Sequence, residues 1–247
     1  MTIFYSVLFS LSDPKQNLYC QMLQLQLAAL RATKTLKETD SYVLMVDPPT
    51  ADYLTKTLPL PRQVQLLKMP GVPKTILEGM MWRYAFPTFW KPAAAGNLCV
   101  YLDLDMLSWR EADFTAPEDS LLAYPEGPPT DANYAGQSPL PLPAGLSSGF
   151  FVYRYGKRVC DLFYETIRSI TAQAEKGEAF YTLDQPHYNH AVARHSACVK
   201  LMPAASVSFN GNTNLETACF LNCAGDPGDG PFHFQKMLSF FVRRFVA

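Results

Sequence analysis

The sequence lacks several features that would assign a chain to a functional class at once. It has no run of about 18 apolar residues, the length that spans a bilayer, so no transmembrane segment is predicted. Lys and Arg total 21 against 22 Asp and Glu, and the basic residues are scattered along the chain. Because a basic cluster is missing, we expect no nucleic-acid partner.

Cysteine and glycosylation patterns are sparse as well. The six cysteines form no Cys-x-x-Cys pair and no zinc-ribbon spacing, and several lie in apolar runs, where a thiol behaves as a small hydrophobic side chain. The chain has no Asn-x-Ser/Thr acceptor, and its apolar N-terminal segment has no early basic residue and no small-residue cleavage site. These absences predict a cytoplasmic location.

Apolar residues are abundant and arranged in a regular order. They make up 48% of the 247 residues, while charged residues make up 17%, so the chain is globular and long enough for a large core. Apolar runs at 2–10, 41–47 and 62–69 alternate with amphipathic helical patterns. This alternation predicts one α/β domain over residues 1–247, with a mostly parallel central sheet flanked by helices.

Two aspartates follow the next apolar run, in the stretch "NLCVYLDLDMLSW". Residues 98–107 are predicted to form a strand that contains Asp103 and Asp105 near its end. Ligands of open parallel sheets bind beyond the carboxyl ends of the strands. Two carboxylates at such a place favour a hard divalent cation, Mn²⁺ or Mg²⁺. The alternative interpretation is a solvated strand end without chemistry.

The remaining elements are predicted from periodicity and breaker residues. A helix over 74–90 should stop at Pro87, since proline cannot continue the turn, and a helix near 181–195 should begin at Asp184 as its N-cap. The segment 127–146, rich in Pro and Gly, is either functional or a surface insertion. Further predictions are strands at 120–126, 146–154, 198–203, 206–210 and 230–234, a long helix at 157–177 and a closing helix at 235–247.

Several of these segments, in the same order, resemble the GT-A glycosyltransferases, particularly the glycogenin-like family 8 group. The similar segments are "VYLDLDML", "LSSGFFVY", "LDQPHYN", "VSFNGN" and "PFHFQK". Ser147 stands where the family usually has Asn, and Lys236 lies closer to His233 than the family's lysine does. The resemblance implies a GT-A fold and transfer of a sugar from a nucleotide diphosphate sugar, most simply a UDP-sugar, to a glycan or other hydroxyl acceptor.

The resemblance also implies roles for individual residues. Mn²⁺ or Mg²⁺ would be held by Asp103, Asp105 and His233, and Asp184 and Gln185 would act at the donor sugar. The other donor contacts would come from Phe9, Ser10, Arg83, Asp103, Ser148, Gly149 and Lys236. Family 8 implies retention of configuration, whereas inversion would need a carboxylate base, for which Asp131 or Asp184 is the candidate.

Other interpretations stay open at this point. Asp103 would be the nucleophile of a haloacid-dehalogenase-like phosphatase, which also ends an apolar strand in Asp-x-Asp. His187, His190 and His195 have a spacing that permits zinc binding on a helix. The chain would alternatively be a nucleotide-sugar-binding module without activity. Two of the site residues also have an alternative role in structure alone. Asp184 would be an ordinary helix cap, and His233 would be a packed histidine between two phenylalanines.

Overall fold

The computed structural model describes residues 1–127, 142–176, 183–212, 214–224 and 230–246. Within these residues the protein is α/β, with a mostly parallel seven-stranded sheet flanked by helices, which confirms the predicted class. The order of this sheet is β3 (Val64–Lys68), β2 (Ser41–Val46), β1 (Thr2–Leu8), β4 (Leu98–Leu102), β7 (Gly145–Arg154), β6 (Ser120–Gly127) and β8 (Val199–Leu201). No helix in the described residues is both long and apolar enough to cross a membrane.

The chain divides into two compact units, each assembled from three segments. Unit 1 comprises Met1–Ile3, Lys74–Tyr101 and Phe114–Ala204. Unit 2 comprises Phe4–Pro73, Leu102–Asp113 and Ala205–Ala247. The single domain over residues 1–247 stays a prediction, and each unit is described by itself below.

Unit 2 contains parallel strands, a small second sheet and the helices that cover them. Strands β2 and β3 pair in parallel, with Tyr42 opposite Val64 and Val46 opposite Lys68. A three-stranded sheet has the order β5 (Met106–Ser108), β10 (Phe220–Asn222) and β9 (Val207–Phe209). The helices of the unit are α1 (Tyr19–Ala32), α2 (Pro48–Thr57) and α7 (Gly230–Phe245), and a short 3₁₀ helix (Pro14–Gln16) precedes α1.

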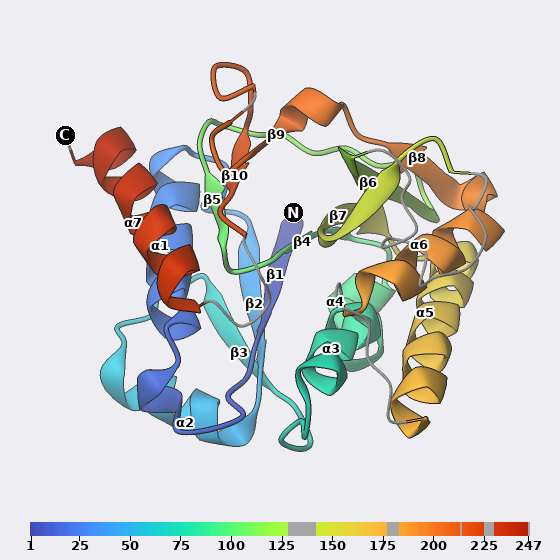
Figure 1. The fold of residues 1–247 in the computed structure, drawn as a ribbon, viewed down its shortest axis with the longest axis horizontal. Helices are drawn as coiled ribbons and strands as arrows, with labels where there is room; N and C mark the ends of the chain where they lie inside the picture. Colours follow the sequence, from blue (N-terminus) through green and yellow to red (C-terminus); the bar gives the residue numbers. More distant parts are fainter. Residues whose placement is uncertain (128–141, 177–182, 213, 225–229, 247) are drawn as a thin grey trace. The chain divides into compact units, whose positions relative to one another are not determined.

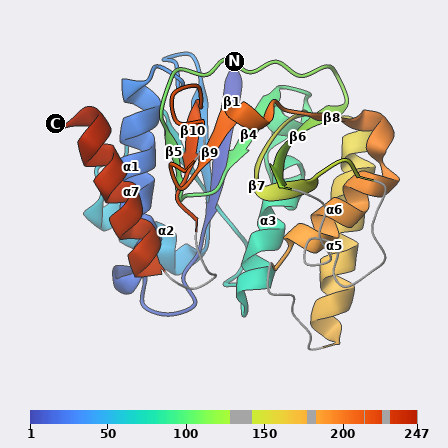
Figure 2. The same cartoon turned by 45° about the horizontal axis from the view of Figure 1, so that its top comes forward.

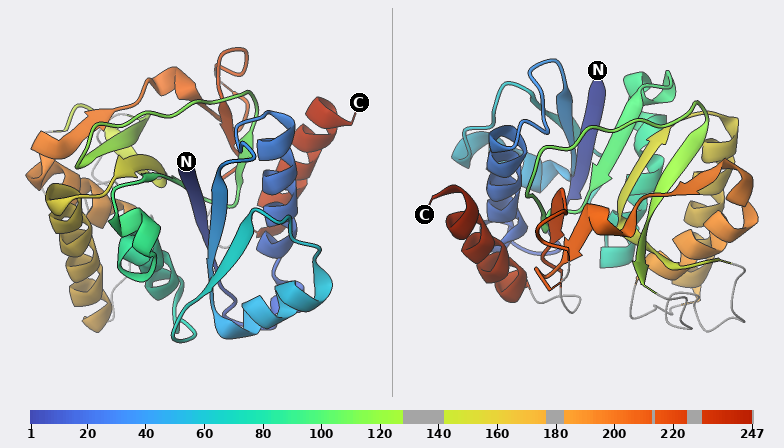
Figure 3. Two further views of the ribbon diagram at one scale, coloured as in Figure 1. Left: turned by 180° about the vertical axis from the view of Figure 1, so that it is seen from behind. Right: turned by 90° about the horizontal axis from the view of Figure 1, so that it is seen from above.

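The core of unit 2 joins α1, α7 and the small sheet. Helices α1 and α7 lie side by side (Figures 1 and 3). One apolar cluster draws on both helices and on β5 and β10: Met22, Ala29, Leu107, Trp109, Leu221, Cys223 and Met237. Burial of these side chains is what holds α7 against α1, since each buried apolar side chain contributes roughly 1.5–3 kcal/mol.

Unit 1 combines a β-hairpin with three packed helices. Strands β6 and β7 pair antiparallel, and β8 pairs with β6 in parallel. Its helices are α3 (Ile76–Phe89), α4 (Lys91–Ala94), α5 (Lys157–Glu175) and α6 (Gln185–Arg194), of which α3, α5 and α6 pack beside the hairpin (Figure 2). Buried aromatic rings fill the interior, and Tyr84 stacks on Phe151 and Tyr188 with centroids 6.0 and 5.9 Å away.

Three predictions of local structure are wrong. The strand expected over 98–107 is two strands in different sheets, because the chain turns at residues 103–105. Helix α3 continues past Pro87 to Phe89, since proline in the last turn removes one hydrogen bond but leaves the preceding turns intact. Residues 230–234 belong to α7, in which His233 and Met237, four residues apart, are both buried on one face.

Candidate functional site

A buried glutamine shapes the turn that carries the Asp-x-Asp motif. The Met106 N–H donates to the Asp103 carbonyl oxygen at 3.0 Å and closes the turn. Gln26 of α1 donates from Nε2 to the carbonyls of Asp103 and Met106, at 2.7 and 2.9 Å. The Tyr42 hydroxyl in turn donates to Gln26 Oε1 at 2.6 Å. Because Gln26 is fully buried, its amide holds the turn in one conformation.

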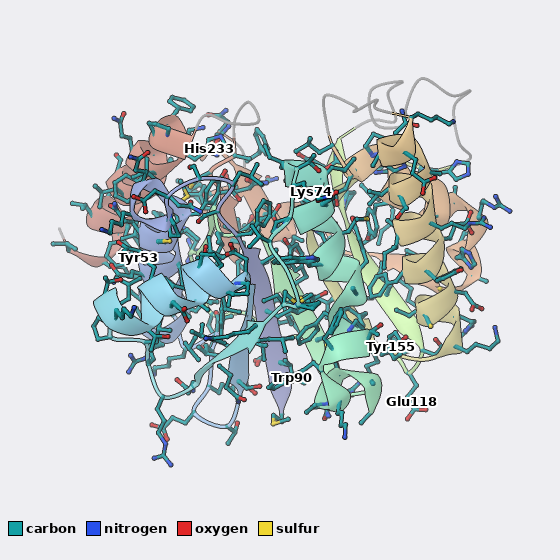
Figure 4. All side chains as sticks on the ribbon, turned by 90° about the horizontal axis from the view of Figure 1, so that it is seen from below. Tyr53, Lys74, Trp90, Glu118, Tyr155 and His233 are labelled. Carbon is teal, nitrogen blue, oxygen red and sulfur yellow. The ribbon has the colours of Figure 1, made fainter. Side chains whose placement is uncertain are left out.

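This turn brings Asp105 close to His233. The Cys223 N–H donates to the Asp105 carbonyl at 3.0 Å, which fixes the backbone beside the end of β10. His233 lies in the first turn of α7 (Figure 4), and its Nδ1 is 3.8 Å from Asp105 Oδ2. The Tyr19 hydroxyl lies 3.3 Å from the same nitrogen. The side chains of His233 and Asp105 are 4% and 12% exposed, so the pair is largely shielded from water.

Two of the three predicted metal ligands therefore lie together. Among the described residues, no group of three or more His, Cys, Asp and Glu side chains is close enough to hold a metal ion, so the side chain of Asp103 does not complete a triad. A carboxylate and an imidazole still suit Mn²⁺. Mg²⁺-type sites are typically built from one or two carboxylates, with substrate phosphates and waters as the other ligands. The Asp105–His233 pair fits an ion bound in that way.

Lys236 joins two of the family-like segments. Its ammonium donates to Asn210 Oδ1 at 2.7 Å and to the Ala224 carbonyl at 3.1 Å. Asn210 and Gly211 form the turn after β9 with positive φ angles of 54° and 72°, and a Cβ on Gly211 would lie 2.6 Å from the Phe240 ring. Lys236 thus ties this turn to α7, and two of its three N–H groups are occupied by these bonds.

The predicted base-binding residues follow β1. Ser10 Oγ accepts from Asn17 Nδ2 and from the Thr50 hydroxyl, each at 2.9 Å. Asn17 Nδ2 also donates to the Phe9 carbonyl at 2.8 Å. The segment at Phe9 and Ser10 is therefore held by side chains from the residues just before α1 and from α2. Asn17 and Thr50 were not identified from the sequence, because nothing local distinguishes them from other loop and helix residues.

Asp47 is a second feature that the sequence analysis missed. It is fully buried at the end of β2, and no described residue gives a hydrogen bond to either carboxylate oxygen. The following Pro48 and Pro49 have no N–H, so the start of α2 offers this aspartate fewer donors than an ordinary helix would. The sequence did contain a sign that this aspartate is unusual, because Asp47 stands between an apolar strand and two prolines.

Unit 1 contains a buried polar network around Asp184. The Tyr84 hydroxyl donates to Asp184 Oδ2 at 2.6 Å, and the Ser148 hydroxyl lies 3.3 Å from Oδ1. An Arg83 terminal nitrogen is 3.7 Å from Oδ2 and donates to the Ser148 carbonyl at 2.8 Å. The Arg83 guanidinium also lies 4.7 Å from the centre of the Tyr101 ring. Arg83 neutralises the Asp184 charge while Tyr84 and Ser148 supply hydrogen bonds.

The environment of Asp184 differs from that of an ordinary helix cap. It occupies the N-cap position of α6, but its side chain makes no capping hydrogen bond and instead turns to the network. Burial, and then the neighbouring Asp184 carboxylate, raises the pKa of Tyr84 well above its ordinary value. Tyr84 therefore stays protonated and keeps donating to Asp184 at any physiological pH.

Other residues of the predicted site hold β7 to α6. Gln185 Oε1 accepts from the Ser148 N–H at 3.3 Å. Asn189, fully buried, accepts from the Leu146 N–H at 2.8 Å and donates to the Leu146 carbonyl at 2.7 Å. The Gly149 N–H donates to Ser147 Oγ at 3.3 Å. The "LDQPHYN" and "LSSGFFVY" segments are thus bound to each other through backbone groups.

The rival zinc reading finds no support in the described residues. Ser169 Oγ lies 2.8 Å from His187 Nδ1, and Glu165 Oε2 lies 2.8 Å from His195 Nε2, so the two rings serve different partners on α5. No three-ligand group includes them among the residues that the structure describes. Asp131, a candidate base for inversion, lies outside the described residues.

All six cysteines lie in the described part of the chain and are free thiols. Burial, followed by the charge of Asp105, raises the pKa of the Cys223 thiol above its ordinary value, so this cysteine is a neutral packing residue.

In comparisons with known proteins, no family model matches the chain and no curated protein matches it significantly.

Proposed function

We propose that the protein is a metal-dependent glycosyltransferase of the GT-A type. It would act in the cytoplasm and move a sugar from a nucleotide diphosphate sugar, most simply a UDP-sugar, to a hydroxyl of a glycan or another acceptor. The observation that supports this best is the Asp105–His233 pair. The two side chains come from distant parts of the sequence, are largely buried, and place an imidazole nitrogen 3.8 Å from a carboxylate oxygen.

Unit 2 carries the groups proposed for the nucleotide diphosphate. Asp105 and His233 would hold Mn²⁺ or Mg²⁺, with Asp103 in the same turn. A bound ion of this kind neutralises a diphosphate and stabilises it as a leaving group. Lys236 would offer its remaining N–H to a phosphate oxygen, and the segment at Phe9 and Ser10 would border the base. The bonds from Gln26 keep the turn fixed, so little reorganisation is needed when donor binds.

Unit 1 carries the groups proposed for the sugar, which are Ser148, Gly149, Asp184 and Gln185. It also carries Arg83, which is the candidate for a contact to the phosphates. Both carboxylate oxygens of Asp184 already lie within hydrogen-bonding distance of protein hydroxyls, and the residue is 2% exposed. Such a carboxylate is poorly placed to take a proton from an acceptor, so its role would be to orient the backbone and the sugar. This favours retention, in which the departing phosphate lies close to the incoming hydroxyl.

Calorimetric titration of UDP into the full chain, with Mn²⁺ and then with EDTA, tests the proposal. We expect binding that requires the metal and that weakens at least tenfold in Asp105→Asn and His233→Gln, because each variant removes one ligand. Asp113→Asn is the matched control. Asp113 belongs to the same unit, is 71% exposed and pairs only with exposed Lys37 in the described structure, so its loss should leave binding unchanged.

Product assays then distinguish the alternatives. Release of UDP from a UDP-sugar in the presence of acceptor hydroxyls supports a transferase. Metal-dependent UDP binding without turnover of any tested donor would favour a nucleotide-sugar-binding module. Absence of UDP binding in both conditions would overturn the donor assignment, and hydrolysis of p-nitrophenyl phosphate that is abolished in Asp103→Asn would favour the phosphatase.

A further inference from the structure

A basic cavity that is wide open to solvent lies in unit 2, outside the groups assigned above. It has a volume of about 530 Å³ and is lined chiefly by Thr33, Lys34, Arg110, Glu111, Arg244 and Phe245. The first two residues follow α1, and the last two end α7. The two helices run side by side and finish at the same end (Figure 1), so their C-terminal turns and the chain after β5 form the walls.

The charge of this cavity is unbalanced. Three cationic side chains face one carboxylate, that of Glu111. Within the described chain, Lys34, Arg110 and Arg244 take part in none of the ion pairs, which join other residues. The C-terminal ends of two helices contribute about half a negative charge each, which still leaves an excess of positive charge. An anion entering the cavity would be attracted.

Arg244 is exposed to solvent, but Trp109 contacts one edge and one face of its guanidinium. Its Nε donates to the Trp109 carbonyl at 3.3 Å, and its guanidinium lies 5.5 Å from the centre of the Trp109 ring. This arrangement uses one N–H and leaves the two terminal nitrogens as a planar fork. Such a fork matches two oxygens of a phosphate group, which a lysine ammonium does not.

Lys34 occupies a backbone conformation that usually selects glycine. Its φ angle is 61°, directly after the C-cap residue Thr33 of α1. A non-glycine residue there costs stability, because its Cβ is crowded in the left-handed region. A lysine at this position therefore adds a positive charge to the cavity at some expense to the fold.

We propose that this cavity binds the phosphate group of a phosphate-bearing ligand, with the Arg244 fork as its main contact and Lys34 and Arg110 as supporting charges. The ligand is either a free phosphate compound or a phospholipid headgroup. The neighbouring Val242 and Val246 on α7 are 43% and 70% exposed, which would suit contact with a lipid surface. The proposal does not depend on transferase activity.

Titration with inorganic phosphate, followed by the chemical shifts of the Trp109 and Arg110 amides, tests the site directly. We expect saturable shifts that weaken at least tenfold in Arg244→Ala, which corresponds to about 1.4 kcal/mol. Arg243→Ala is the matched control. It removes the same charge from the adjacent exposed arginine, which is not among the lining residues. The phosphate binding constant of this variant should differ from that of the wild type by less than twofold.

Lys34→Gly provides a second variant, which we expect to stay folded because glycine relieves the backbone strain. We expect a higher midpoint of thermal unfolding together with weaker phosphate binding. Arg244→Lys keeps the charge but removes the fork, and should weaken binding almost as much as Arg244→Ala. Equal losses in Arg243→Ala and Arg244→Ala, or the absence of any saturable shift, would overturn the proposal.

Vesicle flotation distinguishes the two sources of phosphate. Vesicles of phosphatidylcholine with phosphatidic acid should retain the wild-type protein if the ligand is a lipid headgroup, while vesicles of phosphatidylcholine alone should not. Arg244→Ala and Val242→Ser would then both reduce retention. Saturable binding of inorganic phosphate without retention on the anionic vesicles assigns the cavity to a free phosphate compound.

Discussion

Gln26 Nε2 lies 2.7 Å from the carbonyl oxygen of Asp103, which places the side-chain amide of a buried helix position on the turn of the Asp-x-Asp motif. The relationship explains why the apolar stripe of α1 is interrupted by one glutamine. An apolar residue would remove this donor from the carbonyls of Asp103 and Met106 in the interior, and the Asp103 carbonyl would keep only the Met106 N–H. A buried polar group that is left unsatisfied costs roughly 1–3 kcal/mol.

Replacing this glutamine should therefore affect both stability and binding. Gln26→Met keeps the length of the side chain but removes its donor, so we expect a loss of about 3 kcal/mol in the free energy of unfolding. Mn²⁺-dependent UDP binding should weaken as well, since the turn loses its support. Gln24→Met, an exposed position on the same helix, is the control and should change neither quantity. Equal behaviour of the two variants in urea unfolding would contradict the assigned role.

A pair of neighbouring tyrosines offers a second test. Tyr84 donates to Asp184 at 2.6 Å, whereas no described residue is within hydrogen-bonding reach of the Tyr188 hydroxyl, although the two rings stack at 5.9 Å. Tyr84→Phe should cost about 1.5–3 kcal/mol, because it removes a hydrogen bond to a buried charged group. Tyr188→Phe should cost nothing or stabilise slightly. The midpoints of thermal unfolding separate the two, and similar shifts for both variants would count against the network.

His187 should make stability depend on pH. Burial lowers the pKa of its imidazole from the ordinary value of 6.5, so the unfolded chain binds this proton more readily than the folded one. Neutral His187 therefore contributes fully to the free energy of unfolding above about pH 6.5. This contribution is lost as the pH falls from 6.5 toward the lower pKa that His187 has in the folded protein. Free energies of unfolding measured at pH 7.5, 6.5 and 5.5 test this. The difference in free energy of unfolding between the wild type and His187→Gln should become smaller as the pH drops. A difference that stays constant over this pH range would disprove the role of His187.

Two aspartates that look alike in the sequence should differ in how much they stabilise the fold. Asp119 accepts from the N–H groups of Arg158 and Val159 at the start of α5, each at 3.1 Å, so Asp119→Ala should cost about 1–2 kcal/mol, as the loss of a helix cap does. Asp113→Ala breaks an exposed ion pair with Lys37 and should lower the free energy of unfolding much less than Asp119→Ala does. Urea unfolding gives both values, and a larger loss at Asp113 would refute this ranking.

The cap at α5 also shows why the sequence was insufficient. The residue before α5 is Gly156, whose added Cβ would lie 2.5 Å from Asp119, so a side chain from far upstream fills the place of a local cap. No helix-start signal near residue 156 predicts such a partner. Helix α5 itself was predicted at 157–177, because its long amphipathic pattern is a local property.

Predictions succeeded where neighbouring residues determine the structure, and they failed where residues distant in the sequence determine it. Hydrophobic periodicity and strand runs determined the α/β class, most helices and the position of Asp103 and Asp105 after a buried strand. Periodicity failed at 230–234, where the first turn of α7 reads like alternating strand residues, and at 98–107, where the motif is a turn. In both places the partners that decide the backbone, Met237 and Gln26, lie outside the segment.

By itself the sequence determined which segments form strands and helices, since side-chain pattern acts over a few neighbouring residues. Only the tertiary structure decided that Asp105 meets His233, that Asp184 turns from its helix to Tyr84 and Ser148, and that three cations line one cavity. These relationships depend on burial and on hydrogen-bond partners that the chain brings together across many residues. Their free energies arise from desolvation and geometry, which no single segment contains.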